Sequence, residues 1–109
     1  MREALALFGL LAMTCLFATP VRAADLSAGR AAELERLVLQ DCGSCHGMTL
    51  KGGLGSDLRP QTLAGKSVDV LAEIVLDGVP GTAMPPWRPL LNEDEARWIA
   101  NYLLKGDVP

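Results

Sequence analysis

Apolar residues recur at the spacing of an α-helix in three stretches of the chain, which are separated by segments rich in glycine and proline. In residues 27–40, the apolar side chains lie on one side of the predicted helix and the charged ones on the other. Asp25 or Ser27 can cap the first turn of this helix. Ser67 opens a second, shorter helix that ends before Gly78.

The third stretch, residues 92–106, carries the clearest signals for the ends of a helix. Asn92 followed by Glu95 is typical of a capping box, and Lys105-Gly106 is typical of a helix end. The predicted buried stripe consists of Trp98, Ile99, Tyr102 and Leu103. No stretch alternates with period two over a useful length, so we predict an all-α fold of three to four short helices.

The segment between the first two predicted helices, residues 47–66, contains five glycines and a proline spread along its length: Gly47, Gly52, Gly53, Gly55, Gly65 and Pro60. Glycine lets the backbone adopt turns that other residues avoid. We therefore expect an irregular loop here, of the kind that can wrap over a flat ligand.

The N-terminal residues form a separate unit. Residues 4–18 carry no charge, Arg2 precedes them, and Pro20 to Ala23 lead to a small residue, the plan of a secretory signal peptide. We predict cleavage after Ala23, a mature domain of residues 24–109, and a periplasmic location. The apolar run is shorter than the roughly 20 residues of a membrane span, so a retained membrane anchor and a lipid-modified Cys15 are the weaker alternatives.

Composition limits the possible functions further. The chain of 109 residues has 10 basic and 13 acidic residues and a net charge of −3, which argues against nucleic-acid binding. Only 5% of its residues are aromatic. A domain of this size has a marginal core and usually needs an additional constraint, such as a metal or a covalent cross-link.

That constraint is indicated by Cys42-Gly43-Ser44-Cys45-His46, the pattern for covalent attachment of haem c. Two thiols on one helical turn can each add to a vinyl group of one porphyrin, and His46 then presents its imidazole to the iron. A zinc site would want four ligands, and a thioredoxin-like pair would want a strand before the motif. The sequence offers one cysteine pair, one histidine and a preceding helix.

A single motif and a single histidine predict one haem, whose second axial ligand is a residue other than histidine. Met48 follows His46 by two residues, which span at most about 7 Å of chain, too little to reach the other face of a porphyrin. Met84 lies in a loop before two prolines that hold the backbone extended. We therefore predict His46 and Met84 as the axial ligands; a haem protein with Met84 off the iron, open to ligands or substrates, is the alternative.

This order of motifs resembles the class I cytochrome c fold, in which short helices wrap around one covalent haem. The resemblance implies that the first and last helices cross, setting Leu34 and Val38 against Trp98 and Tyr102. It also implies that the backbone carbonyl of Ser56, where the family often has proline, accepts the Nδ1 proton of the axial histidine.

Two longer strings, residues 37–55 and 84–104, resemble the cytochrome c-55X family. The resemblance implies a small periplasmic electron carrier, not an enzyme, that donates electrons to cytochrome cd1 nitrite reductase in denitrification. An upstream donor, either a quinol-oxidising complex or another cytochrome, would reduce it. A role as an accessory redox factor in the maturation of haem d1 is the alternative. We expect a monomer without stable membrane insertion.

Several residues near the predicted ligands are candidates for supporting roles. Pro85, Pro86 and Trp87 follow Met84 and are candidates for the partner-binding surface, although Trp87 can equally shield the haem. Arg59 and Arg88 are candidates to pair with the haem propionates. Lysine and arginine gather in residues 47–66 and acids on the terminal helices, which predicts a dipolar molecule and salt-sensitive partner encounter.

Overall fold

The first helix is longer than the sequence pattern predicts, and it carries the whole cysteine motif. In the computed structural model, which describes residues 26–109, α1 (Ala28–Leu37) continues through a π-helical turn, η1 (Val38–Cys42), into α2 (Gly43–His46). Ser27 caps the start, since its hydroxyl accepts a hydrogen bond from the backbone N–H of Arg30 at 3.2 Å. The predicted end at Gln40 was wrong, because no residue interrupts the helix before Gly47, whose φ is 93°.

The remaining helices follow in the order of the predicted segments. They are α3 (Pro60–Leu63), α4 (Val68–Asp77) and α5 (Glu93–Lys105), and residues 26–109 contain no strand. The predicted boundaries of α4 and α5 are confirmed, with Ser67 capping α4 and a complete capping box at Asn92. The short α3 was not predicted; it begins with Pro60, whose fixed φ suits the first position of a helix.

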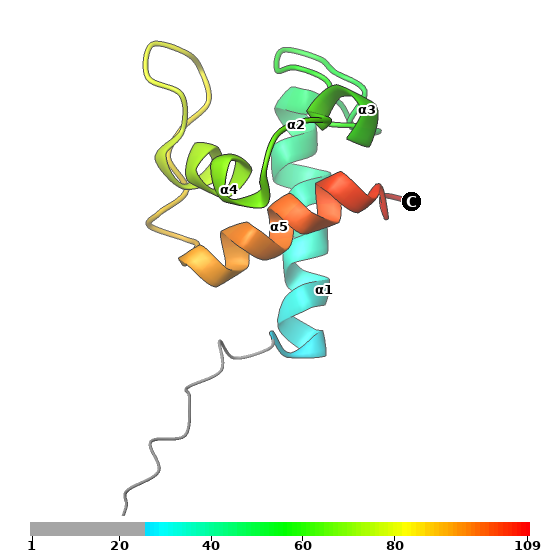
Figure 1. Ribbon diagram of the computed structural model, residues 1–109, viewed down its shortest axis with the longest axis vertical. Helices are drawn as coiled ribbons and strands as arrows, with labels where there is room; N and C mark the ends of the chain where they lie inside the picture. The colour runs from blue at the N-terminus through cyan, green and yellow to red at the C-terminus, as the bar shows by residue number, and fades with distance from the viewer. Residues whose placement is uncertain (1–25) are drawn as a thin grey trace, which may run out of the picture.

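Helix α5 crosses the rod formed by α1 and α2, and α4 packs along α5 (Figure 1). Leu34, Val38 and Ile99 are fully buried where these helices meet, with Tyr102 in the same core and Trp98 partly buried at its edge. The class I arrangement of the first and last helices is thus confirmed. None of the helices within residues 26–109 has the length and apolar character required to span a membrane.

Polar contacts between α1 and α5 stabilise their crossing at two points. The Tyr102 hydroxyl donates a hydrogen bond to Glu35 of α1 at 3.1 Å, and the Tyr102 ring stacks on Trp98 with centroids 5.2 Å apart. At the other end, Arg30 Nε donates to Glu95 Oε1 at 2.6 Å, while Glu95 Oε2 accepts from the Asn92 backbone N–H at 2.9 Å. Glu95 therefore completes the cap of α5 and joins it to α1.

This arrangement predicts a specific effect of acid. The Arg30 guanidinium and the Asn92 N–H hold the pKa of Glu95 below its usual range, so the stabilisation is complete above the ordinary glutamate pKa of about 4.3 and is lost as the pH falls toward the lowered value. We expect Glu95→Gln to be less stable than wild type at pH 7 and to lose less additional stability in acid. Urea unfolding across this pH range measures both effects.

Glu93→Gln is the matched control, because it removes the same charge from the same helical turn and Glu93 has no ion pair within residues 26–109. Equal losses in the two variants at pH 7, or an unchanged acid dependence in Glu95→Gln, would contradict the proposed role of the Arg30–Glu95 pair.

Candidate functional site

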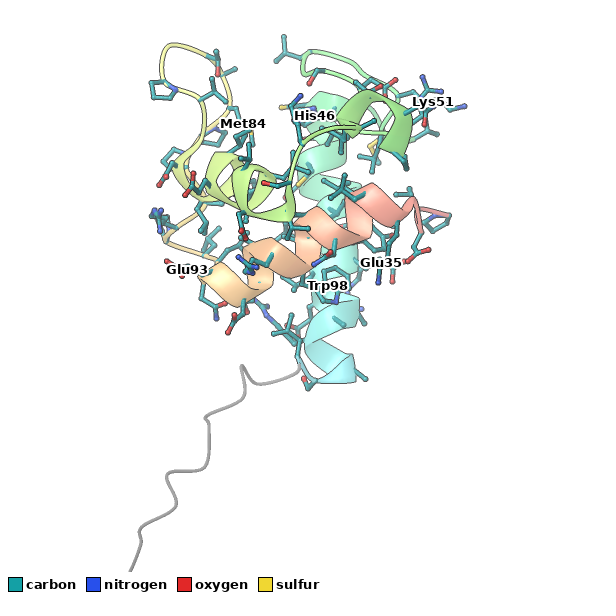
Figure 2. The ribbon with its side chains drawn as sticks, in the orientation of Figure 1. Glu35, His46, Lys51, Met84, Glu93 and Trp98 are labelled. Atoms are coloured by element: carbon teal, nitrogen blue, oxygen red, sulfur yellow. The ribbon has the colours of Figure 1, made fainter. Side chains whose placement is uncertain are left out.

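One cavity of about 510 Å³ brings together all four residues that the sequence singled out as haem ligands. Cys42, Cys45 and His46 line it from η1 and α2, and Met84 lines it from the loop that follows α4. Figure 2 shows His46 and Met84 on facing sides of the upper part of the molecule. The volume falls within the range of about 300–1,000 Å³ that is typical of small-molecule and cofactor sites.

The π-helical turn η1 ends at Cys42, the first cysteine of the motif. Val38 is fully buried in the protein core, whereas Cys42, four residues later, also lines the cavity. Residues four apart share a face in a regular α-helix, and the wider turn of η1 lies between these two positions. Such turns occur frequently at functional sites.

The glycine-rich loop after His46 returns along the end of α2 and caps it. The backbone N–H of Gly55 donates to the carbonyl of Cys45 at 2.7 Å, and that of Gly52 donates to the carbonyl of His46 at 2.8 Å. These carbonyls have no partner within the helix. A Cβ atom on Gly53 would lie 2.8 Å from the Cys45 carbonyl oxygen, so the close approach requires glycine.

The same loop orients the imidazole. His46 Nδ1 lies 2.7 Å from the backbone carbonyl oxygen of Ser56. Because a carbonyl only accepts hydrogen bonds, Nδ1 carries the proton and Nε2 keeps its lone pair for a metal. Gly55 packs directly against the ring, and a Cβ atom there would lie 2.7 Å from Nδ1 and Cε1. The backbone arrangement expected from the class I resemblance is therefore present with serine in place of proline.

The two thiols are free and half-buried. Burial, followed by the charge of Asp41, raises the pKa of Cys42 to about 11. A thioredoxin-like site needs a cysteine whose pKa is lowered, so this environment disfavours that alternative. Within residues 26–109, no three histidine, cysteine or acidic side chains cluster as ligands for a metal ion, so a zinc site has no donor set here.

The fit to a haem is favourable on chemical grounds. The cavity offers two thiols on one helical turn, one imidazole with its Nε2 lone pair available, and one thioether. The rest of its lining is largely apolar, with Leu54, Val79, Ala83, Pro85 and Trp87 among its members. These are the groups that covalent attachment and axial ligation require.

Arg59 and Arg88 do not line this cavity. Arg59 pairs with Asp57 at 2.6 Å, and Arg88 pairs with Asp77. The structure thus gives no support to their predicted contacts with propionates. Trp87 does line the cavity and is half-buried, as the shielding interpretation expects.

Five residues that line the cavity were not singled out from the sequence: Asp41, Leu54, Val79, Thr82 and Ala83. Leu54 lies between two glycines and is 82% exposed, so its side chain has no role in packing the protein core. Thr82 lies two residues before Met84 in a Gly/Pro turn, where a hydroxyl commonly bonds the nearby backbone. The sequence signal that could have identified Thr82 was its position two residues before Met84.

Comparison with known proteins agrees with these features. Residues 29–103 match the family model described as cytochrome c oxidase, cbb3-type, subunit III. The chain is 59% identical over 81 residues to cytochrome c55X of Paracoccus denitrificans (strain Pd 1222), an alignment that covers 74% of this chain and 79% of that protein.

Two solved structures are similar as well. The c-type cytochrome NirC superposes with a TM-score of 0.74 at 49% sequence identity, over 76% of this chain and 98% of that chain. The dihydro-heme d1 dehydrogenase NirN in complex with DHE superposes with a TM-score of 0.59 at 33% identity, over 64% of this chain and 15% of that chain.

The turn that leads to Met84 predicts different effects for two glycine substitutions. Gly78 and Gly81 both have positive φ, 65° and 79°, so alanine at either position costs about 1–3 kcal/mol of backbone strain. A Cβ atom on Gly78 would also lie 2.7 Å from the Met84 carbonyl oxygen and from Pro85 C, whereas one on Gly81 would have no heavy atom within 4 Å. We expect Gly78→Ala to be the more destabilising and to displace Met84.

Urea unfolding compares the stabilities of the two variants, and the methyl NMR signals of Met84 and Met48 report on position. Gly78→Ala should move the Met84 signal and leave that of Met48 in place. Equal effects of the two substitutions on stability would show that the close approach at Gly78 is unimportant.

Proposed function

Because this chain belongs to the cytochrome c55X family of c-type cytochromes, we propose that it binds one haem c and carries single electrons between proteins in the periplasm. The observation that carries this proposal is the meeting of Cys42, Cys45, His46 and Met84 at one cavity. When bound, the haem supplies one-electron chemistry through its ferric and ferrous states.

Each of the four residues has a distinct role in holding the group. Cys42 and Cys45 would form the two thioethers, and His46 would bind the iron through Nε2, which the hydrogen bond from Nδ1 to Ser56 leaves available. Met84 would bind the iron from the loop after α4. A neutral thioether ligand would favour the ferrous state and raise the reduction potential. With His46 and Met84 both bound to the iron, a substrate would have no coordination site, which supports electron transfer over catalysis.

The exposed part of the cavity lining, or lip, includes Leu54 and Pro85 and suits transient contact with another protein. Leu54, from the loop after α2, is 82% exposed, and Pro85, from the loop after α4, is also exposed. Asp41 is the only acidic residue of the lining, and no lysine or arginine lies in it. A lip with a single charged residue suits a small interface that forms and dissociates quickly, as electron-transfer complexes do.

We infer cytochrome cd1 nitrite reductase as the electron acceptor, with a quinol-oxidising complex or another cytochrome as the donor. Residues 1–23 act as a cleaved signal peptide in this proposal; they lie outside the described part of the chain. The similarity to a segment of a dihydro-heme d1 dehydrogenase favours a second candidate, in which the protein exchanges electrons during the maturation of haem d1.

Haem attachment and ligation are tested together by two variants. We expect Cys42→Ala/Cys45→Ala, expressed with the haem-attachment machinery, to lack the mass of a covalent haem and to be largely unfolded by circular dichroism, because a small domain of this composition needs the porphyrin in its core. The oxidised wild type should show the weak far-red band of a thioether–iron bond, and Met84→Leu should lack it. A native-like helical spectrum of the cysteine variant would contradict this account.

Electron transfer is tested by mixing the reduced protein with purified, fully assembled cytochrome cd1 nitrite reductase and nitrite, and following reoxidation by stopped-flow absorbance. We expect fast reoxidation of the wild type and slower reoxidation of Leu54→Glu, because a charge at the lip must be desolvated at the interface. Met48→Glu is the control, because Met48 is 67% exposed and is absent from the cavity lining.

The same experiment separates the two candidate functions. If no electrons reach the assembled reductase, while a deletion strain produces a reductase without haem d1, the maturation role replaces that of electron donor. Equal rates for the wild type and both glutamate variants would remove Leu54 from the proposed docking surface.

A further inference from the structure

The segment between Gly78 and the two prolines forms a closed ring of backbone. The N–H of Val79 donates to the carbonyl of Met84 at 3.2 Å and closes the ring at its neck. Inside the ring, the N–H of Thr82 donates to the carbonyl of Val79 at 3.1 Å. Residues 79–83 are otherwise exposed, so few packing contacts hold their conformation.

One side chain bridges this ring. The Thr82 hydroxyl donates a hydrogen bond to the carbonyl of Val79 at 2.7 Å and accepts one from the backbone N–H of Met84 at 3.3 Å. Thr82 thereby connects the residue that starts the ring to the residue that ends it. Among residues 79–84, these are the only hydrogen bonds in which a side chain takes part.

The structure leaves little freedom at either side of the ring. The backbone of Met84 and Pro85 passes so close to Gly78 that a Cβ atom there would lie 2.7 Å from both. Beyond Met84, Pro85 and Pro86 have fixed φ angles. The conformational freedom that can move Met84 is thus concentrated in residues 79–84, which the Thr82 hydroxyl braces.

We propose that Thr82 is a positioning residue that keeps the Met84 thioether in the cavity by fixing the backbone on which Met84 is carried. This inference rests on the proposed function, since it takes Met84 as an axial ligand. Removal of the hydroxyl takes one acceptor from the Met84 N–H and one donor from the Val79 carbonyl. The ring then opens more easily, and Met84 competes less well against other ligands.

The test uses the intact oxidised holoprotein and imidazole, which competes with the Met84 thioether for the iron. Loss of the far-red thioether band is followed as imidazole is added to wild type, Thr82→Val and Thr82→Ser. For Thr82→Val, which keeps the shape and loses the hydroxyl, we expect half-displacement at about thirtyfold lower imidazole, the factor that two neutral hydrogen bonds of ordinary strength supply. Thr82→Ser keeps the hydroxyl and should behave as wild type.

Thr49→Val is the matched control, because Thr49 is exposed and its side chain makes no hydrogen bond within residues 26–109. Circular dichroism and the absorbance of the attached haem confirm that each variant is folded and loaded. If imidazole displaces Met84 from Thr82→Val at the same concentration as from the wild type, Thr82 has no positioning role. An equal change of that concentration in Thr49→Val would overturn the role of Thr82 as well. Absence of the far-red band from the wild type itself overturns instead the assignment of Met84, and this inference with it.

Discussion

The geometry of the site depends on how closely the backbone of the glycine-rich loop approaches the C-terminal end of α2. Gly55 lies against the His46 ring, and the next carbonyl, that of Ser56, is 2.7 Å from Nδ1. The neighbouring Gly52 and Gly55 amides satisfy the last carbonyls of α2. One stretch of main chain thus ends the helix, selects the imidazole tautomer and forms part of the cavity wall. The close approach requires glycine at positions 53 and 55, where a Cβ atom would lie less than 3 Å from the Cys45 carbonyl oxygen or the His46 ring.

The loop holds this course partly through one residue in an unusual conformation. Leu50 has a φ of 56° and is only 1% exposed. A left-handed leucine is strained, and the conformation persists when surrounding structure determines it. Its N–H donates to the Gly47 carbonyl at 2.8 Å, and its carbonyl accepts from the Leu58 N–H at 2.9 Å. Burial of this side chain therefore fixes the loop on the protein core.

Local signals were sufficient for the parts of the fold that depend on neighbouring residues. The caps at Ser67 and Asn92 involve side chains and backbone three residues apart, so the limits of α4 and α5 could be predicted. The chemistry of the site followed from the cysteine motif and from excluding Met48 by reach. The partner of Arg88 could not be obtained in this way, because Asp77 lies eleven residues away and is brought to Arg88 by the fold. Arg59 pairs with Asp57 only two residues away, so a local partner was visible in the sequence and the propionate interpretation passed over it.

Helix α5 has a consequence that extends beyond the core. It packs on α1, whose continuation carries the two thiols and His46, and on α4, from which the Met84 loop departs (Figure 1). The width of the cavity therefore depends on how α1 and α4 pack on α5, although no residue of α5 lines the cavity. Ile99 and Ala100 of α5 are both fully buried in the core. Because a close-packed interior transmits changes in side-chain volume, the room for a flat cofactor depends on side chains that never touch it.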